Sequence, residues 1–297
     1  MGQSGKIFAF PGDSAVVRRR GRTKERMNEM KKWIVMLLTL TMLMTCALAQ
    51  AQTLRVGMEC NYAPYNWTQA EPDAEGHAVA IAAGGYADGY DVRIAQIIAD
   101  KLGMELEIVK TEWDGLTPAL LSGNIDVIIA GMSPTAERKL TIDFTDAYYV
   151  TELTVVVRKD SAYAAAASLA DLAGAKITGQ MSTFHYDMID QIPGAKKMPA
   201  QDTFSTMIVA VSSGAMDGYI ADIPGAVSAT SANPDLTYLT FAEGQGFTVD
   251  PESAEIAVGI RQGSELKAQI NEILAGISDE ERNEIMIAAV AAQPLSE

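Results

Sequence analysis

The chain is short of cysteine, histidine and positive charge, and each shortage excludes a class of protein. Its 297 residues include 2 cysteines and 2 histidines, and 23 Lys and Arg stand against 38 Asp and Glu. Two cysteines cannot build a disulfide framework, and neither His77 nor His185 has a cysteine or second histidine at metal-ligand spacing. A net charge of −15 has the wrong sign for binding nucleic acid or an anionic membrane. We therefore expect no metal, no cofactor and no nucleic-acid partner.

The common catalytic and phosphate-binding patterns are also missing. The sequence has no G-x-S-x-G nucleophile elbow, no phosphate-binding loop and no glycine fingerprint for dinucleotides. These absences favour a binding protein over an enzyme.

Residues Lys31–Ala49 have the pattern of a secretory signal peptide. Two lysines precede the apolar run Trp33–Met44, which is too short to span a bilayer comfortably, and Ala47-Leu48-Ala49 is a small-x-small cleavage site. We expect the mature chain to begin near Gln50 or Gln52 and to lie outside the cytoplasm, in the periplasm or its equivalent.

The residues before this signal belong neither to it nor to the fold, so we expect the natural start at Met30. Cys46 follows a distant likeness of a lipoprotein box, but Thr45 is a poor residue before a lipidated cysteine, so we expect no lipid anchor. Removing residues 1–49 takes away 9 of the 23 basic and 3 of the 38 acidic residues, leaving 14 and 35, a formal charge of −21. Cys60 alone then remains, which rules out an intramolecular disulfide.

Strand and helix patterns alternate along the mature chain. Thr53–Met58 alternates as a strand, Asp91–Leu102 has one apolar helical face ending at Gly103, and Glu105–Val109 reads as the next strand. Such alternation predicts an α/β fold with mostly parallel sheets flanked by helices. The tract Thr68–Ala87, rich in glycine, alanine and acidic residues, is expected to be a surface insertion near the cleft.

Two apolar strands are expected to carry the chain between two lobes. Thr151–Arg158 would lead into the second lobe and Ala254–Ile260 would lead back. The first lobe would then comprise 53–152 and 254–297, and the second 153–253, with a hinge between them. Two helices, Ser264–Ile277 and Glu280–Ala292, are expected to cover the first lobe.

The segment Ile125–Arg138 points most directly to a function. A buried strand is followed by Gly131, which permits close backbone approach, by the hydroxyls of Ser133 and Thr135, and by the guanidinium of Arg138. Ligands of open α/β sheets bind at the carboxyl ends of strands, and a guanidinium pairs with a carboxylate through two hydrogen bonds. The alternative is a turn with a helix cap and a solvated arginine.

A second segment repeats this pattern. Residues 213–222 read SGAMDGYIAD where residues 122–131 read SGNIDVIIAG. The second copy ends on Asp222, so one strand end carries a cation and the other an anion. Facing each other across a cleft, Arg138 and Asp222 would match the two charges of an amino-acid zwitterion. Alternatively, Asp222 caps the helix that starts at Ile223-Pro224.

With these motifs the chain resembles the periplasmic-type amino-acid-binding proteins of ABC importers, solute-binding family 3. The resemblance runs from Thr53 to about Ser296 through LRVGMECNYAPYNW, GYDVRIAQIIADKLG, EWDGLTPALLSGNIDVIIAGMSPTAERKLTIDFTDAYY and GYIADIP. It implies a two-lobed periplasmic-binding-protein fold of type II. It also implies an amino-acid ligand, a membrane permease as partner, and a monomer that closes on its ligand.

The resemblance also implies roles for individual residues. The ligand α-carboxylate would be bound by the segment that contains Gly131, Met132, Ser133 and Arg138, and the ammonium by Asp222. Ser182 and Thr183, at a helix start in the second lobe, would help to hold the carboxylate. The family usually has Gly-Thr where this chain has Ser182-Thr183, so the loop is expected to approach the ligand less closely.

The resemblance implies that Tyr62 and Trp113 flank the ligand side chain, and Trp113 offers a flat face to an aliphatic stem or a guanidinium. Tyr65 and Trp67 are expected to be core. Glu59 stands where relatives that bind basic amino acids often have an acid, so arginine or lysine is favoured, followed by a polar neutral amino acid such as glutamine. An acid satisfied by backbone N–H groups is the competing interpretation of Glu59.

An enzyme is the alternative function. Secreted cyclohexadienyl or arogenate dehydratases resemble these binding proteins and use the same cleft. Such an enzyme needs an acid for proton transfer, and Glu59 is the candidate. His185, beside Thr183, could line the cleft, but a capping or surface histidine is expected.

Overall fold

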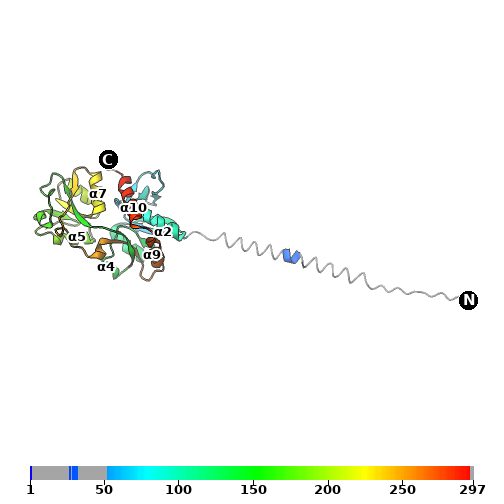
Figure 1. Ribbon diagram of the computed structural model, residues 1–297. Helices are drawn as coiled ribbons and strands as arrows, with labels where there is room; N and C mark the ends of the chain where they lie inside the picture. Colours follow the sequence, from blue (N-terminus) through cyan, green and yellow to red (C-terminus); the bar gives the residue numbers. More distant parts are fainter. Residues whose placement is uncertain (2–26, 28, 33–51, 295–297) are drawn as a thin grey trace. The chain divides into compact units, whose positions relative to one another are not determined.

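The computed structural model of the protein describes residues 1, 27, 29–32 and 52–294 (Figure 1). Most of the expected signal peptide, including Cys46 and the cleavage site, lies outside the described residues. Within them, no helix is long and apolar enough to cross a membrane. The unit that begins at Gln52 contains the whole α/β fold.

The first lobe is built on a five-stranded sheet in the order β6-β1-β7-β14-β8. Strand β1 (Thr53–Met58) pairs in parallel with β6 (Glu105–Lys110) and β7 (Val127–Ile128). Strand β14 (Glu255–Ile260) runs antiparallel between β7 and β8 (Asp143–Val150). The chain therefore places a late strand, β14, in the same sheet as β1.

A second five-stranded sheet has the order β11-β10-β12-β9-β13. Strands β10 (Lys176–Thr178), β11 (Lys196–Lys197) and β12 (Gly218–Asp222) are parallel, whereas β9 (Leu153–Arg158) and β13 (Leu236–Tyr238) complete it with antiparallel pairings. The two sheets agree with the predicted two-lobed fold. The exact lobe boundaries remain predictions.

A third, small antiparallel sheet changes the interpretation of the expected insertion. It has the order β2-β3-β5-β4 and comprises β2 (Asn61–Tyr62), β3 (Asn66–Gln69), β4 (Val79–Ala80) and β5 (Tyr86–Asp88). Both ends of the tract 68–87 are therefore strands, and Ile81 is buried between them. The high glycine and alanine content concealed the strand pattern.

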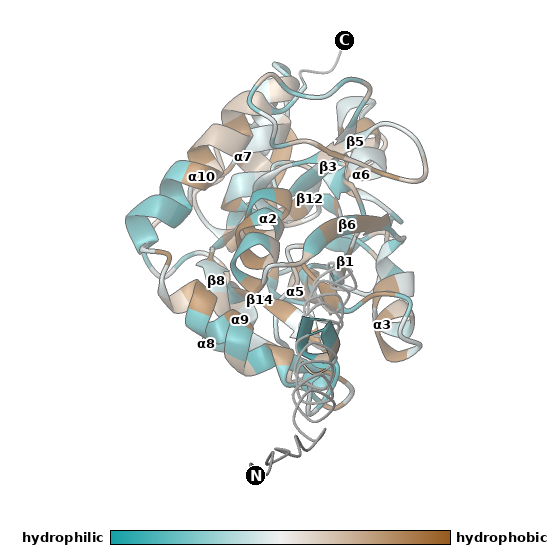
Figure 2. Ribbon diagram, turned by 90° about the vertical axis from the view of Figure 1, so that its right-hand side faces the viewer, coloured by the Kyte–Doolittle hydropathy of each residue, from teal (hydrophilic) through white to brown (hydrophobic). Residues whose placement is uncertain are grey.

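Helices α2 (Tyr90–Leu102), α3 (Trp113–Leu121), α9 (Leu266–Ala275) and α10 (Asp279–Ala292) flank the first sheet. Helix α2 ends at Gly103, whose φ of 66° suits a left-handed cap. Helix α10 begins with a hydrophilic turn and becomes more apolar (Figure 2). It packs against α2 of the first lobe, on the side where it was expected, and also against α7 of the second lobe.

The remaining helices are short. They are α4 (Ala136–Lys139), η1 (Leu169–Leu172), α5 (Phe184–Met188), η2 (Ile189–Gln191), α6 (Phe204–Ser212), α7 (Ile223–Ala232) and α8 (Pro251–Ala254). Ser228 of α7 is hydrogen-bonded to Gln293, just after α10, and both residues are buried.

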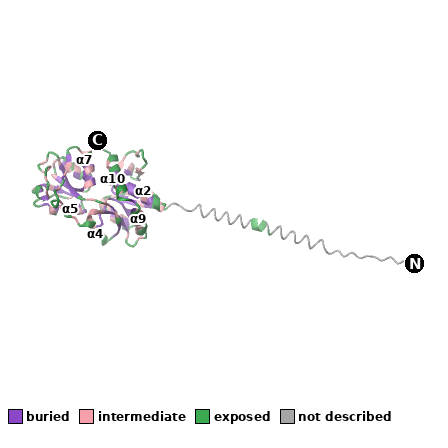
Figure 3. Ribbon diagram, in the orientation of Figure 1, coloured by how far each residue is buried: buried purple, intermediate pink, exposed green. Residues whose placement is uncertain are grey.

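Two hydrophobic cores follow from the alternation of strand side chains. Along β9, Leu153, Val155 and Val157 face a core confined to the second lobe, while Val156 faces the opposite core. That larger core includes first-sheet residues together with Phe204 and Tyr219 of the second lobe. Figure 3 shows the buried residues gathered in the interior of both lobes. Apolar contacts therefore continue across the boundary where the site lies.

Candidate binding site between the two lobes

A small cavity lies where the strand ends of the two lobes meet. It encloses about 10 Å³, room for about one water molecule. Its wall contains six of the expected site residues and four others: Tyr62, Trp113, Gly131, Ser133, Arg138, Gln180, Thr183, Phe184, His185 and Phe204. The structure thus brings together side chains that are more than a hundred residues apart in the sequence.

Arg138 is placed by the short helix α4. Thr135 caps that helix by accepting a hydrogen bond from the Arg138 backbone N–H. The guanidinium turns back and donates a 2.9 Å bond to the carbonyl oxygen of Ser133. Burial lowers the pKa of Arg138 to about 10. Within residues 52–294, Arg138 forms no ion pair with any carboxylate. It is therefore a half-buried cation without a carboxylate partner in the described part of the chain.

Trp113 and Ser182 approach Arg138 from the two lobes. The guanidinium carbon lies 5.0 Å from the centroid of the Trp113 ring. The Ser182 carbonyl oxygen accepts a 3.2 Å bond from the Trp113 indole and a 3.4 Å bond from Arg138. Trp113 was expected to offer its face to the ligand, but here that face holds Arg138. Ser182 has a φ of 56°, a left-handed conformation that glycine adopts more easily, which explains why glycine suits this position.

Thr183 and Gly131 complete the wall beside Arg138 and Ser133. Thr183 is buried and donates a 2.7 Å bond to the carbonyl oxygen of Gln180. Gly131 has a φ of 61°, and its N–H donates a 3.2 Å bond to the Tyr148 hydroxyl. Tyr148 in turn donates to the buried carboxylate of Asp91 at 2.7 Å. Met132 is buried in the core and is absent from the cavity wall.

Asp222 lies at the end of β12 and caps the helix that follows, while its role toward a ligand stays a prediction. Its side chain accepts a 2.8 Å bond from the Gly225 N–H and so caps α7. It also accepts a 2.5 Å bond from the hydroxyl of Tyr62 on the first lobe. Burial raises the pKa of Asp222 from its ordinary value, although both hydrogen bonds oppose the shift.

Glu59 follows β1 and is buried. Its carboxylate accepts a 2.9 Å bond from the Gln180 side chain of the second lobe. Burial raises the pKa of Glu59 to about 7, the Gln180 bond opposes this shift, and repulsion from Glu112 and Asp114 adds to it. The competing interpretation, a carboxylate held by backbone N–H groups, finds no such bond among the described residues. Glu59 is instead a cross-lobe contact.

Sequence reasoning missed three parts of the wall. Phe204, the first residue of α6, stacks on Tyr62 with ring centroids 3.9 Å apart. Gln180 reaches Glu59 from the loop that carries Ser182 and Thr183, and its place directly before this motif was the only available signal. His185 was expected to cap a helix or lie on the surface. This expectation was wrong because its ring is buried in the cavity wall.

The other aromatic residues of the first segment are structural. Tyr65 and Trp67 are buried, as expected. A wider groove of about 430 Å³ adjoins Trp67, with Phe204 in the walls of both the groove and the cavity. Arg138 lines the smaller cavity and not this groove, whereas Asp222 lines neither and reaches the cavity wall through its hydrogen bond with Tyr62.

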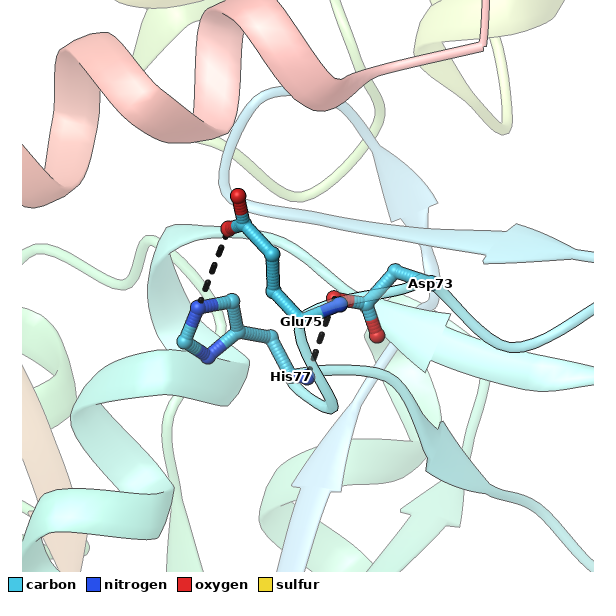
Figure 4. Close-up of side chains that lie close together, drawn as sticks. All are labelled: Asp73, Glu75 and His77. Carbon is cyan, nitrogen blue, oxygen red and sulfur yellow. Dashed lines mark hydrogen bonds and ion pairs between the residues drawn. The ribbon is translucent and has the colours of Figure 1, made fainter.

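Outside the cavity, Asp73, Glu75 and His77 converge in the loop before β4 (Figure 4). Glu75 lies 3.5 Å from the His77 Nε2 atom and is mostly exposed. The Asp73 carboxylate accepts bonds from the backbone N–H groups of Glu75, His77 and Ala78. Asp73 therefore has a structural role, because these bonds hold the loop in shape.

Known proteins are similar to this chain in both fold and sequence. L-arginine-bound crystal structure form 2 of an amino acid ABC transporter substrate-binding protein from Streptococcus pneumoniae has a TM-score of 0.70 and 26% identity, covering 82% of this chain and 96% of that one. The arginine-binding extracellular protein ArtP of Bacillus subtilis (strain 168) is 27% identical over 84% of this chain and 94% of its own length.

A third similar protein has an enzymatic descendant. It is the ancestral amino acid-binding protein AncCDT-1, a precursor of cyclohexadienyl dehydratase, with a TM-score of 0.65, 28% identity, and coverage of 85% of this chain and 99% of that one. The sequence profile of the bacterial extracellular solute-binding proteins, family 3, matches residues 54–287. The chain therefore belongs to the bacterial extracellular solute-binding proteins of family 3.

Proposed function

We propose that this protein captures an α-amino acid with a cationic side chain between its lobes and delivers it to the permease of an ABC importer. The observation that carries the proposal is the state of Arg138. A half-buried guanidinium beside a cavity, with no carboxylate partner within residues 52–294, is suited to a ligand carboxylate. Gly131, Ser133, Ser182 and Thr183 surround the place where that carboxylate would bind.

Asp222 supplies the opposite charge for the ligand ammonium. It is buried beside the aromatic rings of Tyr62 and Tyr219, whose faces also favour a cation. A simple anion would leave Asp222 without a partner, and a simple cation would leave Arg138 without one. The two residues together therefore favour a zwitterion.

The preference for a basic side chain rests on Glu59. Glu112 and Asp114 repel the ionised form of Glu59, so three acids act on one region of the cleft. A ligand cation would relieve this repulsion, whereas a neutral amino acid would not. The similar proteins that are named for arginine or hold it support the same preference. A polar neutral ligand such as glutamine is second.

The cavity volume of about 10 Å³ requires the lobes to separate before an amino acid enters. Hinge opening and closing around the ligand is the established way in which two-lobed binding proteins achieve this. The protein would act outside the cytoplasm, as members of this family do, after removal of the signal peptide, and would function as a monomer.

A dehydratase is the second candidate function. A buried carboxyl whose pKa lies near 7 is suited to general acid catalysis, and Glu59 meets that description. Its side chain is held by Gln180, which would need to release it for proton transfer. The similarity to a dehydratase precursor gives this reading its support.

Calorimetry on protein that has been unfolded, freed of ligand and refolded tests the main proposal. Titration with the twenty amino acids should give tight binding of arginine or lysine. Mass spectrometry of mixtures with prephenate or arogenate should show no conversion. Turnover of either compound without amino-acid binding would favour the dehydratase instead.

A further inference from the structure

His185 is a buried polar side chain without a partner. Its ring lies in the wall of the cavity beside Arg138, and neither Nδ1 nor Nε2 has a hydrogen-bond partner within the described part of the chain. Buried polar groups of folded proteins are nearly always paired, so an unpaired imidazole facing a binding cavity requires an explanation.

The position of the ring is fixed by its neighbours. The Phe184 ring lies 4.5 Å from it and the Phe204 ring meets it edge-on at 6.3 Å. Helix α5 lies close against Gly179, where an added Cβ would come within 2.9 Å of the Tyr186 backbone. The imidazole therefore cannot move readily to find another partner. A phenylalanine would satisfy the same aromatic packing without burying two polar nitrogens.

The imidazole is neutral in this environment. Burial, together with the positive charge of Arg138, lowers the pKa of His185 to about 3. A neutral imidazole has one N–H donor and one acceptor nitrogen. Because its neighbour Arg138 lacks an anion, a carboxylate that binds to the guanidinium would come within reach of the same histidine.

We propose that His185 is a ligand-binding residue whose imidazole N–H donates a hydrogen bond to the carboxylate of the amino acid held by Arg138. This inference rests on the proposed function. It adds a donor from the second lobe, so that the carboxylate itself links the two lobes when they close. His185 would thus contribute to closure as well as to affinity.

The test compares His185→Phe with His185→Gln in ligand-stripped protein. Phenylalanine retains the ring packing and glutamine retains an N–H donor. L-arginine should bind at least about tenfold more weakly to His185→Phe, with part of the loss recovered in His185→Gln. The unfolding temperature of ligand-free His185→Phe should equal or exceed that of the wild type, because no buried polar group is left unpaired. His77→Phe, which changes the only other histidine, is the matched control and should bind normally.

Equal affinity of wild type and a folded His185→Phe protein would overturn the inference and leave the ring a packing residue. If wild type binds no amino acid at all, the proposed function fails instead, so the two failures are distinguishable. Should the variants not fold, nitrogen NMR of wild-type histidines provides the second measurement. Arginine should slow the solvent exchange of the His185 imidazole N–H and leave that of His77 unchanged. An unchanged His185 N–H would contradict the proposal.

Discussion

Tyr62 donates a 2.5 Å hydrogen bond to Asp222 across the boundary between the lobes, and both residues are buried. Asp222 is also the proposed partner of the ligand ammonium, so the tyrosine hydroxyl and the ligand compete for one carboxylate. The adjoining cavity of about 10 Å³ cannot admit an amino acid while this pair stays closed. Ligand entry must therefore displace the Tyr62 hydroxyl from its position on Asp222.

Tyr62→Phe should consequently strengthen amino-acid binding by roughly three- to tenfold. The change removes the competing hydroxyl, whose hydrogen bond to a charged group is worth about 1.5–3 kcal/mol. Only part of that free energy appears as tighter binding, because Asp222 loses a donor. The ring stays to stack on Phe204. Calorimetry with arginine measures the effect. Weaker binding would show that the hydroxyl keeps its contact with Asp222 in the complex.

Arg138→Ala should abolish measurable binding of every amino acid while the protein stays folded. Loss of one member of a desolvated charge pair costs about 2–5 kcal/mol or more in binding. The neighbouring Lys139→Ala is the control because that side chain points to Glu252 on the surface, 2.7 Å away. Circular dichroism checks the fold. Micromolar binding by a folded Arg138→Ala protein would refute the carboxylate assignment.

The fold could be predicted from the sequence because its signals are local. For the apolar strand Thr53–Met58 and the helix that ends at Gly103, a few neighbouring residues are enough to predict the structure. The small sheet around residues 68–87 could not be predicted, because its strands are two to four residues long, too short to show a clear alternating pattern.

The site shows the same division. Arg138 and Asp222 were recognisable because each follows a strand in a repeated motif. The cross-lobe pairs of Glu59 with Gln180 and of Tyr62 with Asp222 depend on how two lobes approach, which no local pattern encodes. The burial of His185 depends equally on that approach.

Asp222→Asn should weaken binding of an amino acid far more than binding of its 2-hydroxy analogue. Only the amino acid presents an ammonium, whereas both ligands present the carboxylate. The asparagine oxygen can still cap α7 by accepting from Gly225, so the helix should persist. Parallel titrations with arginine and its 2-hydroxy counterpart measure the difference. Equal losses would mean that Asp222 acts only as the helix cap.

Asp126→Asn should destabilise the protein without changing the binding residues. Asp126 accepts bonds from Arg55 at 2.8 and 3.0 Å and lies 3.4 Å from Arg261. Burial acts to raise the pKa of Asp126, but these arginines hold it below its ordinary value. The side-chain bond from Arg55 is the largest of the lowering effects. The native state therefore favours the carboxylate, so this contribution is present above about pH 4 and is lost as the pH falls further. In urea unfolding, the free energy of unfolding should differ less between pH 7 and pH 3 for the variant than for the wild type.

Glu59→Gln tests the preference for a basic side chain. Burial raises the pKa of Glu59 to about 7, so the carboxyl is largely protonated at pH 6 and largely ionised at pH 8. If the ligand cation requires the ionised form, arginine affinity should rise about tenfold over this range, as expected for a single competing proton. Glu59→Gln should bind arginine weakly at both values, and glutamine should bind with little pH dependence. Glu105→Gln, an exposed change on β6, is the control.

The same titration has an independent consequence for the ligand-free protein. Because the folded state keeps a proton on Glu59 that the unfolded chain releases, stability should fall as the pH rises from about 4.5 to about 7. Asp91, whose pKa burial also raises to about 7, contributes a trend of the same sign. Only the difference between wild type and Glu59→Gln therefore reports on Glu59, and that difference should level off above pH 7. Tenfold tighter binding of glutamine than of arginine and lysine by wild type would refute the basic-ligand preference, while the roles of Arg138 and Asp222 would stand.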